Sequence, residues 1–140
     1  MLEAPEAFSD SPTGTRAVQS LVGPKNSDFL RAFGKPERLL ACECERTSSA
    51  TLVQSFQMFN GESLRKKLAD RKNRIGRLLD AGAKDEAMLD EFFLAALSRH
   101  PDADEKKSAL EHLRSDKDRR KAWENLAWAL LNSKEFLFLK

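Results

Sequence analysis

The sequence predicts an all-α fold, an irregular bundle of about five or six helices around a buried C-terminal helix, with an extended N-terminal segment. Residues 122–131 are apolar apart from Glu124 and Asn125, so a helix there would be apolar on nearly every side, as buried helices are. Helix-capping residues and helical apolar spacing recur through the second half of the chain. One stretch, residues 37–46, reads as extended, and it is too short to build a sheet alone.

Length and charge restrict the class of protein. The chain has 140 residues, and we expect residues 1–26 to form a tail or linker and residues 27–140 to form one helical domain. The formal net charge is +2, from 24 Lys and Arg against 22 Asp and Glu, which disfavours a nucleic-acid partner. No apolar segment reaches transmembrane length, so we expect no membrane insertion. The acidic first residues lack the pattern of a signal peptide, and the chain itself indicates no location.

The N-terminal half predicts two helices separated by the extended stretch. A short helix is expected over residues 28–33. Residues 37–46 then alternate as an extended segment does. A second helix, over residues 50–59, is expected to end in a left-handed cap formed by Asn60 and Gly61.

The next part of the chain predicts three helices. Residues 62–81 are expected to form two short helices, because residues 70–73 and Gly76 weaken the middle of this segment, and Gly82 closes it. Residues 85–98 predict a clear helix whose broad core face consists of Met88, Leu89, Phe92, Phe93, Ala96 and Leu97.

The last part of the chain predicts two more helices. Asp102 and Glu105 form a capping-box pattern that opens a helix ending near Leu113. Asp116 or Asp118 then starts the tryptophan-bearing helix, in which we expect Trp123 and Trp128 to be buried. Glu124 in this helix is expected to pair with one of the cations at 119–121. Residues 136–139 are expected to fold back as a final apolar plug.

Cys42 and Cys44 form the one motif that invites chemistry. On an extended segment both thiols face the same way, so they could share a soft metal ion, although zinc wants four ligands and neither His100 nor His112 has partner spacing. A disulfide between them would be strained and easily reduced. The third alternative is that both pack as small apolar residues beside Leu40. We expect no bound cofactor.

A cationic run is the second candidate site. Residues 65–77 hold seven cations and one acid, Asp70, which leaves a local charge of 7 − 1 = +6 that could attract phosphates or a sulfated polysaccharide. No aromatic residue lies among them, so stacking on single-stranded nucleic acid is unsupported. The alternative is a solvated helix face, balanced by the acidic starts of the next two helices. The cations are Arg65, Lys66, Lys67, Arg71, Lys72, Arg74 and Arg77.

The sequence contains no recognisable catalytic motif. It has no phosphate-binding glycine loop, no Gly-x-Ser-x-Gly and no His-Glu-x-x-His. It also has no Tyr and two His, so the commonest general acids and bases are scarce. We therefore expect that the chain is not an enzyme.

Five ordered segments carry a resemblance that covers about residues 16–138. They are 29–36, 42–46, 59–61, 94–99 and 129–138, and they include Cys42, Glu43, Cys44, Glu45, Arg46, Asn60, Gly61, Asn132, Ser133, Glu135 and Phe136. In this order they resemble the C-terminal domain of unknown function of planctomycete cytochrome-c-associated proteins (domain of unknown function fifteen-fifty-three).

The resemblance implies a larger parent protein of the cell envelope or periplasm. Its relatives join a cytochrome c-like module, a second uncharacterised domain and often a carbohydrate-binding-like sandwich to this domain, near sulfatase-like genes that suggest polysaccharide use. This chain departs from them at Leu139 and Lys140, where they usually have Asn-His, and at Lys84, where they tend to have Ser or Thr.

These observations favour a non-catalytic helical interaction or structural module at the C-terminal end of such a protein. Its expected partners are other domains of the parent or a partner protein. The alternative is an accessory thiol-redox or electron-transfer element that uses Cys42 and Cys44.

Overall fold

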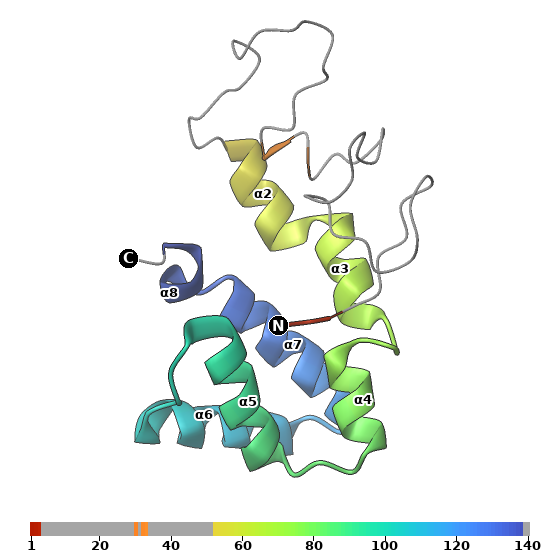
Figure 1. Cartoon of the computed structure of the whole chain (residues 1–140), viewed down its shortest axis with the longest axis vertical. Helices are drawn as coiled ribbons and strands as arrows, with labels where there is room; N and C mark the ends of the chain where they lie inside the picture. Colours follow the sequence, from red (N-terminus) through yellow and green to blue (C-terminus); the bar gives the residue numbers. More distant parts are fainter. Residues whose placement is uncertain (4–29, 31, 34–51, 139–140) are drawn as a thin grey trace, which may run out of the picture. The chain divides into compact units, whose positions relative to one another are not determined.

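The computed structural model describes residues 1–3, 30, 32–33 and 52–138, and the statements below refer to these residues (Figure 1). Residues 4–26 of the predicted tail, the extended stretch, residues 28, 29 and 31 of the first predicted helix, and Leu139 lie outside them. The chain forms two compact units, one of Met1–Ala4 with Lys67–Lys140 and one of Pro5–Lys66. We call the first of these the core unit.

The prediction of an all-α fold is confirmed, because the described residues contain helices and no strand. As predicted, residues 62–81 form two short helices and not one. The helices are α2 (Leu52–Asn60), α3 (Glu62–Ala69), α4 (Arg74–Asp80), α5 (Asp85–Leu97), α6 (Ala103–Ser115), α7 (Arg119–Leu131) and α8 (Lys134–Leu137).

Helix α7 is the centre of the core unit, as predicted. It contacts α4, α5, α6 and α8, and Figure 1 shows it passing between α4 and the pair α5 and α6. Trp123 is fully buried, and its ring centroid lies 5.5 Å from that of Phe92 on α5. All six residues of the predicted core face of α5 are buried. Burial of these large side chains is the main force that holds α5 against α7.

The prediction that α7 is buried on nearly every side is wrong. Asn125, Trp128 and Ala129 are exposed, and Trp128 keeps 37% of its surface accessible. These residues are three and four apart, so they lie on one face of the helix. The helices of the core unit pack against the opposite face, which carries Trp123 and Ala127, and α7 is therefore amphipathic in burial although not in sequence.

The predicted apolar plug is also wrong. Phe136 is half-buried, whereas Leu137 is 36% exposed and Phe138 is 73% exposed. Helix α8 has four residues and buries none of them, because it is held by polar contacts at its start. A single turn fixed in this way cannot place three consecutive apolar side chains on its inner side.

The helix ends mostly follow the predicted caps. The capping box of Asp102 and Glu105 is present. Of the two predicted starts of the tryptophan-bearing helix, Asp116 and Asp118, it is Asp118 that caps α7, by accepting a hydrogen bond from the Lys121 N–H at 3.1 Å. Gly82 has a φ of +68°, as a glycine closing a helix does. The left-handed cap at Gly61 is wrong, because no residue there has a positive φ. The Gly61 carbonyl accepts from the Arg65 N–H instead, so α3 begins without a reversal.

Asn73 explains the break between α3 and α4. Its side-chain amide donates to the carbonyls of Lys67 and Leu68, both at 2.9 Å, and its Oδ1 accepts from the Gly76 N–H at 2.9 Å. The side chain thus ends one helix and caps the next. It is fully buried and fully hydrogen-bonded, which fixes the turn that carries Arg71.

Candidate functional site

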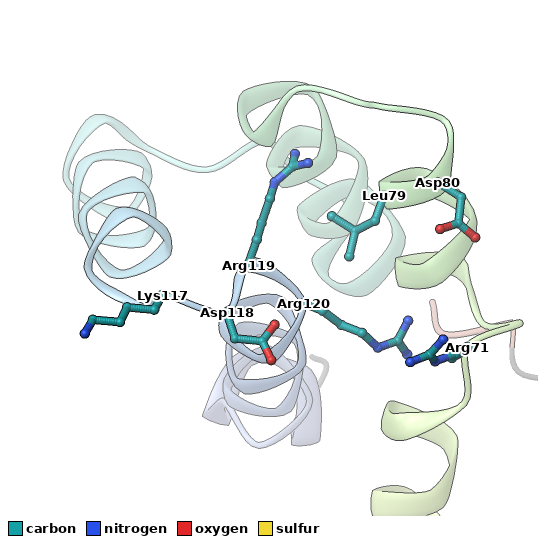
Figure 2. Close-up of a pocket in the computed structure, with 7 residues that line it drawn as sticks. All are labelled: Arg71, Leu79, Asp80, Lys117, Asp118, Arg119 and Arg120. Atoms are coloured by element: carbon teal, nitrogen blue, oxygen red, sulfur yellow. The ribbon is translucent and has the colours of Figure 1, made fainter.

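An open pocket of about 530 Å³ lies in the core unit, where the turn before α4 and the end of α4 face the start of α7 (Figure 2). Four of its seven lining residues are cationic and two are acidic. The lining residues are Arg71, Leu79, Asp80, Lys117, Asp118, Arg119 and Arg120.

The two arginines at the start of α7 are held by fixed contacts. Arg119 donates through Nε and Nη2 to Asp85 Oδ1 at 3.0 and 2.8 Å, and through Nη2 to the Ala83 carbonyl at 2.6 Å. Arg120 donates through Nε to Glu124 at 2.7 Å, which confirms the predicted pairing of Glu124, and through Nη2 to the Asp70 carbonyl at 3.0 Å. Such contacts orient both guanidinium groups in advance of any ligand.

Asp85 connects this pocket to the core. Its Oδ1 also accepts from the indole N–H of Trp123 at 3.0 Å. Partial burial alone would raise the pKa of Asp85, but the hydrogen bonds from Trp123 and Arg119 outweigh it, so the pKa is lowered. Asp85 is therefore ionised at neutral pH and ties the start of α5 to the start of α7.

Arg71 is placed beside Arg120 by a close backbone approach. A Cβ added to Gly76 would overlap the Arg71 carbonyl oxygen and lie 3.1 Å from Arg120 Nη1. Only glycine allows this approach. In Figure 2 the side chains of Arg71 and Arg120 extend toward each other, whereas Lys117 points away.

The predicted cationic run is divided by the fold. Arg65 and Lys66 belong to the unit Pro5–Lys66, where Lys66 pairs with Glu62 at 2.8 Å. Lys67, Arg71, Lys72, Arg74 and Arg77 belong to the core unit. There Arg74 pairs with Glu91 at 2.7 Å, and Arg77 pairs with Glu3. The run therefore offers less unpaired charge than its sequence indicates. Arg71 is the member that lines the pocket.

The thiol prediction lies outside the described residues, as do Cys42, Glu43, Cys44, Glu45 and Arg46. It stays a prediction. Within the part of the chain that the structure describes, no group of three or more His, Cys, Asp or Glu side chains is arranged to hold a metal ion. No helix among the same residues is both long enough and apolar enough to cross a membrane.

A second surface of interest lies around α8. Leu94 on α5 is 44% exposed, and Trp128, Leu137 and Phe138 are exposed as given above. Helices α5, α7 and α8 contact one another, and Figure 1 places α8 beside the end of α7. We call these four residues the α8 surface. A contiguous exposed apolar patch is typical of a surface that another protein covers.

A three-residue ion cluster fixes α8. Arg99, which follows α5, donates to Glu105 of α6 at 2.7 and 2.8 Å and to Glu135 of α8 at 2.7 Å from each of two nitrogens. The Arg99 hydrogen bonds lower the pKa of Glu105 to about 2 and also lower the pKa of Glu135. The guanidinium carbon of Arg99 lies 5.6 Å above the Phe93 ring. One arginine thus joins three helices.

Several residues of the family-type motifs have structural roles. Ser133 caps α8 by accepting from the Phe136 N–H at 3.2 Å, and Glu135 belongs to the ion cluster. Asn132 ends α7 and donates to the Trp128 carbonyl at 2.9 Å. Its Oδ1 is buried without a hydrogen-bond donor among the described residues. Asn60 ends α2, and Gly61 is buried between α2 and α3.

Sequence reasoning missed the pocket and the role of Asn73. The sequence predicts Arg119 and Arg120 only as partners of Glu124, although two arginines at the start of an apolar helix indicate positive charge concentrated at one point. Their meeting with Arg71 had no local signal, because the two segments are about fifty residues apart.

A comparison with protein families finds one match over most of the chain. The family described as PSD1, protein of unknown function (DUF1553), matches residues 8–113. Neither the curated proteins nor the solved structures contain a match to this chain.

Proposed function

The chain belongs to the PSD1 family of proteins of unknown function (DUF1553), and from this premise we propose that it is a non-catalytic helical module that docks onto another domain of a larger parent protein. The parent is a cell-envelope protein of the cytochrome-c-associated kind. The docking contact is the α8 surface.

The observation that carries the proposal is the exposure of Leu94 on α5 and of Phe138 directly after α8, which are 44% and 73% accessible, since α5 and α8 contact each other. Full burial of a large apolar side chain is favourable by roughly 1.5–3 kcal/mol of free energy, so binding of another protein domain over this surface would be favourable. If these side chains form one contiguous patch, the patch favours an interaction module over an isolated monomer.

The charges beside the α8 surface support an apolar occupant. Arg99 pairs with both Glu105 and Glu135, so each of these three charged side chains already has a partner of opposite sign within the chain. The occupant that fits is therefore an uncharged, apolar protein face.

The experiment is a calorimetric titration of this chain with the remaining domains of the parent protein, prepared as a separate polypeptide. We expect saturable binding with a negative heat-capacity change, which marks apolar burial. The variants Leu94→Ser and Phe138→Ser should each weaken binding about tenfold or more.

Val53→Ser is the matched control, because Val53 is 59% exposed and lies on α2 in the other unit. It should leave the affinity unchanged. Absence of binding, or an equal effect of all three substitutions, would refute the proposal.

A further inference from the structure

We propose that the pocket between α4 and α7 binds a tetrahedral oxyanion, a phosphate or sulfate group carried on a small molecule, through Arg71 and Arg120. Nothing in the docking proposal requires this site. The two surfaces share no residue, because the α8 surface consists of Leu94, Trp128, Leu137 and Phe138.

The first step of the argument is the set of unused donors. Arg120 donates through Nε to Glu124 and through Nη2 to the backbone carbonyls of Ala69 and Asp70. Its Nη1 has no acceptor among the described residues. Arg71 forms no hydrogen bond or ion pair through its side chain in the same part of the structure. A guanidinium group offers donors in a fork that matches two oxygens of a phosphate or sulfate.

The second step is the charge between these donors. Glu124 compensates Arg120, but no carboxylate pairs with Arg71 among the described residues. The close approach at Gly76 keeps the backbone of Arg71 next to Arg120, and the two side chains extend toward each other, so their like charges repel (Figure 2). An anion between them would relieve this repulsion and satisfy both sets of donors.

The third step is the size and polarity of the pocket. Its volume of about 530 Å³ lies within the range of small-molecule sites, which run from roughly 300 to 1,000 Å³. A free phosphate or sulfate ion would leave most of this space empty. Leu79 supplies an apolar wall against which the carbon skeleton of an ester could pack.

The test is a titration of the full chain followed by the Nε–H signals of arginine in proton–nitrogen correlation spectra. The probes are inorganic phosphate, inorganic sulfate, glucose 6-phosphate and glucose 6-sulfate, with sodium chloride at matched ionic strength. We expect saturable shifts at Arg71 and Arg120 with at least one tetrahedral anion and no saturation with chloride. The preferred inorganic anion identifies the group, and its sugar ester should bind more tightly.

The variant Arg71→Gln should weaken the affinity about tenfold, as expected for the loss of a charged hydrogen-bonding group. Lys72→Gln is the matched control, because it removes the same charge one residue away and does not line the pocket. Lys117→Gln is the second control, because Lys117 lines the pocket but points away from it. The affinity of each control variant should stay within about twofold of the affinity of the unsubstituted chain.

Two results would overturn the inference. One is a shift that grows linearly with every salt, chloride included. The other is an equal loss of affinity in Arg71→Gln and Lys72→Gln, which would indicate unspecific charge attraction. The thermal midpoint of Arg71→Gln should match that of the unsubstituted chain, because the Arg71 side chain forms no hydrogen bond or ion pair among the described residues.

Discussion

Asn73 shows how one side chain sets the geometry of the candidate site. Its three hydrogen bonds end α3 and cap α4, and they fix the turn in which Arg71 and the Arg120-binding carbonyl of Asp70 lie. An asparagine in a polar segment gives no sequence signal of complete burial, since this residue type is mostly exposed in proteins. Its role depends on where two carbonyls and one N–H happen to meet.

The variant Asn73→Ala should lower the free energy of unfolding by about 2–4 kcal/mol, because it removes a helix cap and the hydrogen bonds to the buried Leu68 carbonyl and the part-buried Lys67 carbonyl. Urea denaturation measures this change. Asn73→Asp should also destabilise, because the carboxylate keeps the cap acceptor but cannot donate to the Lys67 and Leu68 carbonyls. Lys72→Ala, at the exposed neighbouring residue, should change stability by less than about 0.5 kcal/mol. An Asn73→Ala variant as stable as this control would contradict the assignment.

The Arg99 cluster predicts a dependence of stability on pH. Glu105 has a folded pKa of about 2 against an ordinary value of 4.5, so its contribution is present above the ordinary pKa and is lost as the pH falls from about 5 toward 2. The pKa of Glu135 is lowered too, and it acts in the same direction. The effect should be modest, since all three side chains are about a third or more exposed.

The variant Arg99→Gln isolates this contribution. Its urea midpoint should lie below that of the unsubstituted chain at neutral pH. The difference between the two midpoints should shrink as the pH falls from about 5 toward 2. A difference that is independent of pH would show that Arg99 stabilises the fold by packing on Phe93 alone.

At the scale of elements, the sequence predicts where helices begin better than which faces they bury. Caps are local, so Asp102 with Glu105, Asp118 and Gly82 could be identified from a few neighbouring residues. The exposure of Trp128 depends instead on how many helices surround α7. Its apolar neighbours carry no information about which face of the helix is exposed. The predicted left-handed cap at Gly61 is wrong for a related reason: α3 follows directly, so no reversal of the chain is needed there.

Helix α5 starts without a side-chain cap, which predicts a stabilising substitution. Lys84 has the extended backbone of a cap, with φ −74° and ψ 143°, but its side chain forms no capping hydrogen bond. Lys84→Ser should therefore raise the free energy of unfolding by about 1 kcal/mol. Lys84→Ala is the control, because it removes the charge without supplying an acceptor. Equal thermal midpoints for the two variants would exclude a capping effect.

At the scale of the whole molecule, the division into two compact units has a consequence for cooperativity. Every buried apolar residue identified among the described residues, from Leu68 to Leu131, lies in the core unit. The sequence predicts one domain over residues 27–140, and a domain of that kind would unfold in a single transition. The structure groups the chain into two compact units with a boundary between Lys66 and Lys67, and from this grouping we expect the two units to unfold separately.

Tryptophan fluorescence can test whether the two units unfold separately. It contains two tryptophans and no tyrosine, and both tryptophans lie in α7 of the core unit. Indole fluorescence therefore reports on the surroundings of α7, whereas far-ultraviolet circular dichroism also reports on α2. We expect the dichroism to change first at lower urea concentration, and the fluorescence to change later, because the fully buried Trp123 is released only when the core unit opens. Coincident transitions would show that the two units fold as one cooperative body, and that the single domain predicted from the sequence is correct.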